Sequence, residues 1–324
     1  MEIKMENFRF GIMGAGEIAV KFCDAVRRLE NCEVAAVSSK SMEKAEKFAQ
    51  SSNVPKAYGS YREMLENEKL DCVYIAVLPN AHFELCMLCL DYHMPVLCEK
   101  AMFMDSSEAA AVFERSEKQN VFVMEALWSR FLPAVRKGKQ WLEEGRIGRI
   151  RLSDATIGFL APYGDENRYH NPALGAGAAH DIMVYAYEIT TYMFPQEIVD
   201  TRAVALWEAT GTDLTDHAVL RFADMTATMT ASLGAALDER IIIYGEDGRI
   251  VIPHPHYADE AFLCDREGRV TEHFRDEETE NGFTYEIQEV MDCIRAGKTE
   301  SEVVSHKCTL ECSELYDKIA MSKI

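Results

Sequence analysis

The sequence is poor in positive charge and in long hydrophobic runs. It contains 34 Lys and Arg residues against 54 Asp and Glu residues, so its formal net charge at pH 7 is -20. Proteins that bind nucleic acid or anionic membranes need clustered Lys and Arg, which this balance argues against. No apolar run is long enough to span a bilayer, and the first residues lack the apolar core of a secretory signal. We therefore expect a cytoplasmic protein that binds neither nucleic acid nor membranes.

A disulfide framework and a cluster of metal ligands are also missing. The 10 cysteines are scattered through apolar segments, which is typical of a reducing compartment. Cys86 and Cys89 form a CxxC pair inside an apolar helical segment with no second ligand pair, so we interpret them as buried thiols. His254 and His256 lie between two strands without a partner cluster, and we assign them to a loop. The sequence predicts no metal site.

What the chain does contain is a dinucleotide fingerprint near its start. Residues 8–13 form a predicted buried strand, and Gly14-x-Gly16-x-x-Ala19 leads from it into an amphipathic helix. In this motif the first glycine permits a tight turn, the second leaves room for a pyrophosphate, and the small third residue lets helix pack on strand. The spacing alone is a weak signal, but a second strand at 33–37 closes a βαβ unit around it. The candidate cofactor-binding residues of this turn are Gly14, Gly16, Glu17 and Ile18.

Strands and helices alternate along residues 1–124, a pattern typical of an α/β protein with a doubly wound parallel Rossmann sheet. The near-continuous apolar run at 70–77 matches a central strand of such a sheet. Beyond this part long strands dominate between about 150 and 252, with a helix at about 178–193. They predict an α+β domain with a large, mainly antiparallel, open-faced sheet. We therefore expect a dinucleotide-binding domain at 1–124 and a substrate-binding and oligomerisation domain at 125–324.

The end of the second strand bears on the choice of cofactor. An NAD site normally carries Asp or Glu there to bond the ribose hydroxyls, but this chain has Ser38-Ser39-Lys40. Hydroxyl groups and a cation suit the 2′-phosphate of NADP, whereas a solvated helix-capping turn is the alternative interpretation. The sequence thus predicts NADP as the cofactor, with NAD as the alternative, and Ser39 and Lys40 as residues that bind it.

Two other places carry side chains suited to acid–base chemistry. Lys100 directly follows the strand at 95–98, where a partly desolvated ammonium could tune or relay a proton; a surface ion pair with Glu99 is the plainer alternative. Asp181 and Tyr185 are four residues apart on the helix at 178–193, so they share one face. A phenol can exchange a proton with a substrate oxygen while a carboxylate orients it, although by spacing alone a buried Tyr and a helix N-terminal Asp would be commoner.

Six segments in order resemble the glucose-fructose oxidoreductase/inositol dehydrogenase/rhizopine catabolism (Gfo/Idh/MocA) family over nearly the whole chain. They are residues 11–19, 78–82, 96–101, 124–133, 168–172 and 175–185. The first four are similar to the family's cofactor-binding segments and its hinge between domains. The last two are similar to its substrate loop and its Asp-x-x-x-Tyr/His catalytic helix. Within the family the chain looks most like members of the dimeric dihydrodiol dehydrogenase and glucose-fructose oxidoreductase types.

The resemblance implies a role for each matching residue. Lys100, Asp181 and Tyr185 would be catalytic, and together with Arg168 they would bind the substrate. The implied cofactor-binding residues of the later segments are Pro79, Asn80, His82, Glu99, Lys100, Trp128 and Arg130. Two positions depart from the family pattern: Ala101 replaces a proline that is often cis, and Met183 replaces a glycine and could narrow the pocket.

The implied activity is hydride transfer between a nicotinamide and a hydroxyl or carbonyl carbon of a sugar, cyclitol or cyclic diol. Two alternatives belong to other classes. One is a glycosidase that retains its cofactor and uses transient oxidation. The other is a non-catalytic regulator that senses the cofactor, to which Ala101 lends some weight. A sensor has no need of Lys100, Asp181 and Tyr185 together, which favours the dehydrogenase.

The alternating strands of the second domain bear on its assembly. One face of the sheet packs on helices of the same chain, and the other meets water or a partner. Residues such as Ile241, Ile243, Val219 and Met229 give the sheet more apolar side chains than one covered face needs. We predict a homo-oligomer, namely a dimer formed face to face across this sheet.

Overall fold

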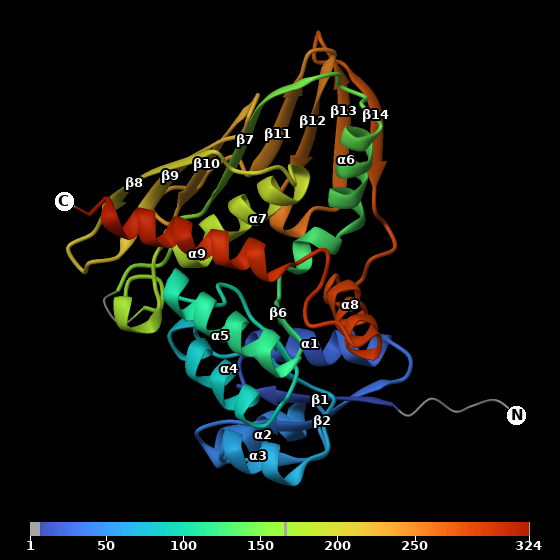
Figure 1. Ribbon diagram of the computed structural model, residues 1–324, viewed down its shortest axis with the longest axis vertical. Helices are drawn as coiled ribbons and strands as arrows, with labels where there is room; N and C mark the ends of the chain where they lie inside the picture. Colours follow the sequence, from blue (N-terminus) through green and yellow to red (C-terminus); the bar gives the residue numbers. More distant parts are fainter. Residues whose placement is uncertain (1–6, 165–166, 324) are drawn as a thin grey trace, which may run out of the picture. The chain divides into compact units, whose positions relative to one another are not determined.

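The computed structural model describes residues 7–164 and 167–323. Its chain divides into two compact units (Figure 1). The first unit runs to Phe103 and also includes Ser107–Ala126 and Asn281–Thr309. The second unit comprises Met104–Ser106, Leu127–Glu280 and the residues from Leu310 onwards. The C-terminal part of the chain therefore contributes to both units.

A six-stranded parallel sheet forms the centre of the first unit, in the order β3-β2-β1-β4-β5-β6. This is the doubly wound topology that the alternating pattern predicts, and its strand order reverses between β1 and β4, where such sheets bind ligands. The strands are β1 (Phe8–Met13), β2 (Cys32–Ser38), β3 (Ala57–Tyr58), β4 (Cys72–Ile75), β5 (Val96–Cys98) and β6 (Val123–Glu125). The helices are α1 (Glu17–Arg28), α2 (Met42–Ser51), α3 (Tyr61–Asn67), α4 (His82–Asp91), α5 (Ser106–Gln119) and α8 (Phe283–Arg295).

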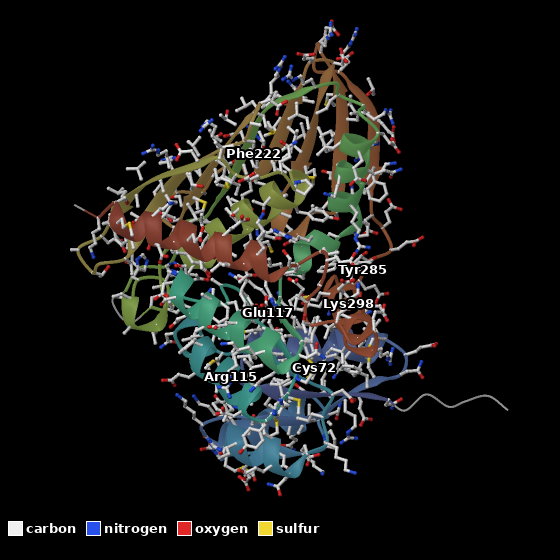
Figure 2. All side chains as sticks on the ribbon, in the orientation of Figure 1. Cys72, Arg115, Glu117, Phe222, Tyr285 and Lys298 are labelled. Atoms are coloured by element: carbon white, nitrogen blue, oxygen red, sulfur yellow. The ribbon has the colours of Figure 1, made fainter. Side chains whose placement is uncertain are left out.

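Buried aromatic rings and thiols fill the core of this unit. Phe22 of α1 stacks on Tyr74 of β4 with ring centroids 3.9 Å apart, and both side chains are fully buried. Cys72 of the same strand, labelled in Figure 2, is also fully buried. Cys86 and Cys89 are free and buried, which confirms their interpretation as core thiols.

Helix α8 belongs to the first unit although it follows the whole second sheet in sequence. It packs against α1, and Nδ2 of Asn281, just before it, donates to the backbone oxygen of Lys21 at 3.0 Å and to Oδ2 of Asp24 at 2.9 Å. At the edge of the parallel sheet, the Val123 N–H donates to the Thr299 carbonyl at 3.0 Å. Residues 281–309 thus complete the first unit.

An eight-stranded sheet forms the second unit, in the order β14-β13-β12-β11-β7-β10-β9-β8. Only β7 and β10 pair in parallel among its described strands, so the sheet is mainly antiparallel, as predicted. Its strands are β7 (Ile150–Gly158), β8 (Asp200–Trp207), β9 (Asp213–Arg221), β10 (Thr226–Ser232), β11 (Arg240–Gly245), β12 (Gly248–Pro253), β13 (Glu260–Asp265) and β14 (Val270–Arg275). The strands β13 and β14 are additions to those expected from the sequence.

Helices cover one face of this sheet. In Figure 1, α6 (Pro133–Glu143) lies against β12 and β13, and α7 (Val184–Met193) lies against β7 and β10. A short π-helical segment, η4 (Ala179–Met183), leads into α7, and α9 (His306–Met321) ends the chain. Phe222, which directly follows β9 and is labelled in Figure 2, packs edge-on against Phe194 with ring centroids 6.0 Å apart.

The opposite face of the sheet is open, and most of the apolar sheet residues named from the sequence lie on the covered face instead. Ile241, Ile243 and Met229 are fully buried on the covered face, and of the four named residues only Val219 is on the open face. The other three residues lie on the covered face, because residues two apart on a strand share a face and the covered face takes these positions. The exposed apolar residues of the open face are Leu152 (37% exposed), Val204 (58%), Leu206 (61%) and Val219 (38%).

The described part of the chain holds neither a candidate membrane-spanning helix nor a candidate metal cluster. No helix in that part of the chain is both long and apolar enough to cross a bilayer. Residues 7–164 and 167–323 also hold no group of three or more His, Cys, Asp or Glu side chains placed to share a metal ion.

Candidate functional site

The glycine turn between β1 and α1 has the geometry that a pyrophosphate needs. Gly14 has a φ of +114°, and a Cβ there would lie 2.3 Å from the Ala76 carbonyl oxygen, so only glycine fits. A Cβ at Gly16 would meet nothing within 4 Å, which leaves open space in front of the first N–H groups of α1. Gly16 is the N-cap of α1 and has no side-chain capping bond. Glu17 and Ile18 open this helix, whose N-terminus favours an anion.

The turn after β2 carries two buried serine hydroxyls and an exposed lysine. Ser38 is buried, and its hydroxyl donates to the Ile12 carbonyl at 3.1 Å, so it holds β2 to β1. Ser39 is 8% exposed, and its oxygen accepts from the Ser41 N–H at 3.4 Å. Lys40 is exposed. No carboxylate stands in the Ser38–Lys40 turn, so an incoming 2′-phosphate meets no acidic side chain of this turn.

The segment after β4 is tied to the segment after β5 through His82. Its imidazole is fully buried, and its two nitrogens lie 3.0 Å from the carbonyl oxygens of Ala101 and Val77. Burial lowers the pKa of His82, so the ring is neutral at pH 7 and donates one of these bonds. Pro79 and Asn80, in the preceding 3-10 turn (Pro79–Ala81), lie nearer the surface. His82 therefore fixes the loop that presents them.

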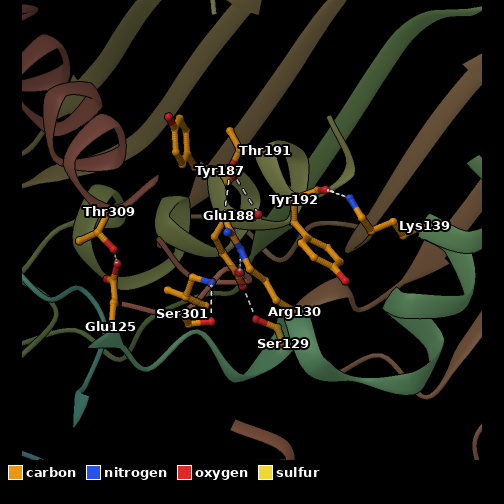
Figure 3. A network of polar contacts seen from close by, with 11 residues as sticks. Glu125, Ser129, Arg130, Lys139, Tyr187, Glu188, Thr191, Tyr192, Ser301 and Thr309 are labelled. Carbon is orange, nitrogen blue, oxygen red and sulfur yellow. Dashed lines mark hydrogen bonds and ion pairs between the residues drawn. The ribbon is translucent and has the colours of Figure 1, made fainter. Parts of the chain in front are cut away.

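Glu99 anchors the backbone beside Lys100. Its carboxylate is 9% exposed, accepts the Tyr74 hydroxyl and receives the Lys100 N–H at 3.3 Å. Burial raises the pKa of Glu99, while the Tyr74 bond and the Lys100 charge oppose that rise. The Lys100–Ala101 peptide bond is cis. On the far side of this turn, the Met102 N–H donates to Glu125 at 2.9 Å, and Glu125 also accepts the Thr309 hydroxyl at 2.8 Å (Figure 3).

Arg130 lies in the core of the second unit rather than at its surface. It is 3% exposed and comes from a short 3-10 turn, η2 (Trp128–Phe131). Figure 3 shows its guanidinium against α7, where Nε donates to Oε2 of Glu188 at 3.1 Å and Nη2 donates to Thr191 at 3.0 Å. The Ser129 hydroxyl donates to the other oxygen of Glu188. This buried network holds η2 to the helix that carries Tyr185, and Trp128 begins the same turn half-buried.

A buried aspartate caps the start of that helix. Oδ2 of Asp213 accepts the Ala179 N–H at 2.6 Å. A Cβ on Gly177, whose φ is +124°, would lie 2.1 Å from Oδ1 of Asp213, so glycine is required there. Asp216 lies in the same strand, fully buried, and burial together with the neighbouring Asp213 charge raises its pKa to about 10. The Asp213 side chain therefore caps the N-terminus of this segment, a position that favours an acidic residue.

Asp181 and Tyr185 project from this capped segment. Oδ1 of Asp181 lies 3.2 Å from Nη1 of Arg168, and the Asp181 side chain is only 14% exposed, so the ion pair fixes the carboxylate. Arg168 itself lies over the Tyr169 ring at 4.0 Å. The Tyr185 ring is half-buried and lies 5.1 Å, between centroids, from that of His256. The sequence predicted a plain helix here, but its first turn is π-helical, a local widening common at functional sites that residue spacing does not reveal.

The hydrogen bond and the ring contact of His180 are made with Met104 and Tyr316 rather than with Asp181 or Tyr185. Its Nε2 lies 3.0 Å from the Met104 carbonyl oxygen, and its ring packs 4.5 Å from that of Tyr316. Burial lowers the pKa of His180. Met183 is also fully buried. Both side chains therefore help to hold the segment that carries Asp181 and Tyr185.

Comparison with known proteins identifies the chain. A family described as "Oxidoreductase family, NAD-binding Rossmann fold" matches residues 8–127, and the GFO/IDH/MocA C-terminal domain matches residues 135–251. A trans-1,2-dihydrobenzene-1,2-diol dehydrogenase from Xenopus laevis is 31% identical over 308 residues, which cover 92% of each chain. The chain belongs to the Gfo/Idh/MocA family. It is an NAD(P)-dependent oxidoreductase.

Solved structures share the fold across the whole chain. A single-residue mutant of a 3-ketoreductase from Actinomadura kijaniata, in complex with NADP and TDP-benzene, superimposes with a TM-score of 0.85 at 22% identity, and the match covers 96% of both chains. A levoglucosan dehydrogenase in complex with NADH and levoglucosan gives a TM-score of 0.88 at 19% identity, covering 98% of this chain and 97% of its own. These two relatives bind different nicotinamide cofactors, so the fold alone does not fix the preference.

Several residues that shape the site escaped prediction from the sequence. The partners Glu188 and Asp213 were not singled out, because a lone acidic residue in an apolar helix or a strand gives no indication of what it contacts. His256 was assigned to a loop. The unusual spacing His254-Pro-His256 was the available signal, and the structure places this loop against Tyr185.

Proposed function

We propose that this protein is an NADP-preferring dehydrogenase that interconverts a secondary hydroxyl and a carbonyl on a cyclic diol or sugar. The observation that carries the proposal is the pair Asp181 and Tyr185 on one capped segment, with Asp181 fixed by Arg168 at 3.2 Å. The similarity to dihydrodiol dehydrogenases over 92% of the chain supports the substrate class. Residues 1–124 would hold the cofactor and residues 125–324 the substrate.

The proposed chemistry assigns one task to each side chain. When bound, the nicotinamide supplies a hydride acceptor or donor. Tyr185 takes the hydroxyl proton during oxidation and returns it to the carbonyl oxygen during reduction. Lys100 stabilises the negative charge that develops on this oxygen. Asp181, held by Arg168, accepts a hydrogen bond from a second hydroxyl and so orients the ring.

A substrate screen tests this proposal. Sugars, inositols and dihydrodiols would each be offered with NADP and with NAD, and the reverse reaction with NADPH and NADH. We expect absorbance at the reduced-nicotinamide wavelength to change with at least one diol or sugar. Hydrolysis of a glycoside without added cofactor would instead select the glycosidase alternative, and cofactor binding without any turnover would select the regulator.

The cofactor preference follows from the turn after β2. The open space at Gly16 and the helix N-terminus fit the pyrophosphate that NAD and NADP share. The difference lies in the 2′-phosphate, which Ser39 and the exposed Lys40 can bind through donors and a positive charge. The proposed cofactor-binding residues also include Pro79, Asn80, His82, Glu99, Trp128 and Arg130. Of these, His82, Glu99 and Arg130 act through the backbone that they hold in place.

Lys40→Ala should weaken NADPH binding about tenfold to a hundredfold while leaving NADH binding nearly unchanged, because one charge-assisted hydrogen bond contributes roughly 1.5–3 kcal/mol. Fluorescence titration of both cofactors measures the ratio. Lys44→Ala, one turn further along on α2, serves as the control for a general loss of positive charge. Equal affinity of the wild type for the two cofactors, or an unchanged ratio in Lys40→Ala, contradicts the preference.

The open face of the second sheet supports a homodimer. Four apolar side chains are exposed there: Leu152, Val204, Leu206 and Val219. Replacing Val204 and Leu206 with Lys should shift the sedimentation coefficient from dimer to monomer at micromolar protein, because buried like charges oppose association of two identical faces. Val20→Lys and Met321→Lys, at exposed apolar positions outside the sheet, are controls that should stay dimeric. A monomeric wild type would refute the dimer.

The compartment is part of the same proposal. All 10 cysteines are free, which supports residence in the reducing cytoplasm. Cell fractionation followed by immunoblotting tests this assignment.

A further inference from the structure

The segment His254-Pro255-His256-Tyr257 lies against the helix that carries Tyr185. His254 follows β12 with a φ of 45° in the left-handed region, and η5 (Pro255–Tyr257) forms a 3-10 turn closed by the Tyr257 N–H on the His254 carbonyl at 2.9 Å. This turn packs on α7 and on η2, all within the second unit. Residues 254–257 therefore form a tight turn that packs against α7 and η2.

Two tyrosine rings hold the imidazole of His256. Its centroid lies 5.1 Å from that of Tyr185 at an interplanar angle of 37°, and 4.4 Å from that of Tyr257 in an edge-on arrangement at 86°. The His256 side chain is 20% exposed. Its contact with Tyr185 therefore restricts the phenol ring from one side, while the remaining exposure lets it exchange protons with water.

A carboxylate is fixed behind this imidazole. Oε1 of Glu239 accepts the Gly158 N–H at 3.2 Å, which turns Oε2 toward Nδ1 of His254 at 3.3 Å and Nδ1 of His256 at 4.0 Å. The backbone adds a further tie, because the His254 N–H donates to the Glu239 carbonyl at 3.0 Å. With the Glu239 side chain only 13% exposed, its charge is poorly screened. The Glu239 carboxylate therefore lies within ion-pair distance of both imidazole rings.

We propose that His256, supported by Glu239, is a positioning residue for Tyr185: it holds the phenol ring and places a titratable positive charge beside it. This inference rests on the proposed function of Tyr185. During oxidation the phenolate accepts the hydroxyl proton, and the hydride of the same carbon would pass to the oxidised nicotinamide when it is bound. During reduction the phenol gives that proton back. A neighbouring imidazolium stabilises the phenolate, so the oxidation reaction can run closer to neutral pH.

The other charged and titratable groups that the structure describes around the turn do not supply a positive charge beside Tyr185. On its own segment, His254 faces Glu239, and the Tyr257 hydroxyl lies 3.0 Å from His254. The pKa of Tyr257 is raised by burial and by Glu239, so Tyr257 stays neutral. Arg130 lies on η2, and its guanidinium is already paired with Glu188 of α7 at 3.1 Å.

Replacing His256 with Phe tests the inference, because Phe keeps an aromatic ring against Tyr185 and removes the charge. In the oxidation direction, activity rises with pH as the phenolate forms. Loss of the cation makes the phenolate harder to form, so this rise should move to higher pH by about one unit. The KM and the cofactor Kd should change little. Glu239→Gln should shift the profile in the same direction by less.

A matched control and a second measurement keep the outcome unambiguous. His273→Phe removes another histidine of the same unit, which pairs with Glu260 at 3.1 Å, and its profile should match the wild type. Independently of turnover, 13C-labelled tyrosine gives the Tyr185 titration by NMR, with the signal assigned through its loss in Tyr185→Phe. If His256→Phe fails to fold, His256→Gln takes its place.

Failure of the inference and failure of the proposed function give different results. A Tyr185 titration that is the same in the wild type and in His256→Phe overturns the role of His256, whether or not the enzyme turns over. An enzyme without oxidoreductase activity on any diol or sugar overturns the proposed function, while a shifted Tyr185 titration still supports the electrostatic coupling.

Discussion

Tyr185→Phe should lower turnover by about 10²–10⁴-fold, the usual cost of losing a positioned acid or base. The change removes one oxygen and keeps the ring, so the contact with His256 and the packing of α7 should persist. Cofactor affinity should be nearly unchanged, because the phenol is assigned to the substrate oxygen. Steady-state kinetics on the best substrate from the screen, together with cofactor titration, measure both quantities.

A surface tyrosine supplies the control for this loss. Tyr92 lies on the first unit, where its hydroxyl donates to Glu66 at 2.7 Å, and Tyr92→Phe should keep full activity. Lys100→Ala should resemble Tyr185→Phe in turnover if the lysine stabilises the developing charge. A Tyr185→Phe enzyme with near-normal kcat would refute the assignment of the proton to this residue.

Glu188→Ala should destabilise the second unit by about 3–5 kcal/mol, because it leaves the guanidinium of Arg130 buried without its counter-charge. The side chains of Arg130 and Glu188 are 4% and 1% exposed, so water cannot replace the lost partner. The Ser129 hydroxyl loses its acceptor at the same time. The urea midpoint of the unfolding transition, followed by circular dichroism, reports the change.

The double variant Arg130→Met with Glu188→Leu removes both charges together. It therefore tests whether the stability lost in Glu188→Ala comes from the buried charge that is left without its partner. Well-packed apolar residues often replace a buried ion pair at little cost, so the double variant should recover most of the stability that Glu188→Ala loses. Glu302→Ala, which breaks the exposed pair Lys298–Glu302, should leave the midpoint almost unmoved. A Glu188→Ala protein as stable as the wild type would mean that the network of Figure 3 does not hold η2 to α7.

The first unit was predictable because its physical constraints are local. A parallel strand buried on both faces must be apolar, as at 70–77, and the Gly14 turn favours glycine because its backbone has a φ of +114°. Such requirements act within a few residues of chain and leave a direct trace in the sequence. The strand order then follows from right-handed crossover connections between parallel strands.

The surroundings of the candidate catalytic residues were predictable only in part, because they depend on contacts between distant segments. Asp181 and Tyr185 could be placed on a helix, but nothing in their spacing indicates the π-helical turn or the cap from Asp213, more than thirty residues later. The face of the second sheet that stays open could not be predicted for the same reason. Alternation shows that Ile241 and Ile243 share a face, yet only the packing of α6 and α7 decides which face is covered.

The return of residues 281–309 to the first unit affects how the protein is made. During synthesis the N-terminal sheet leaves the ribosome long before α8 exists, so its helix α1 and the edge strand β6 wait without their partners at Asn281 and Thr299. The cofactor-binding unit can therefore finish folding only after residues 281–309 have been translated. Ribosomal pausing or truncation late in the message would leave this unit incomplete, although its parallel sheet is encoded near the beginning.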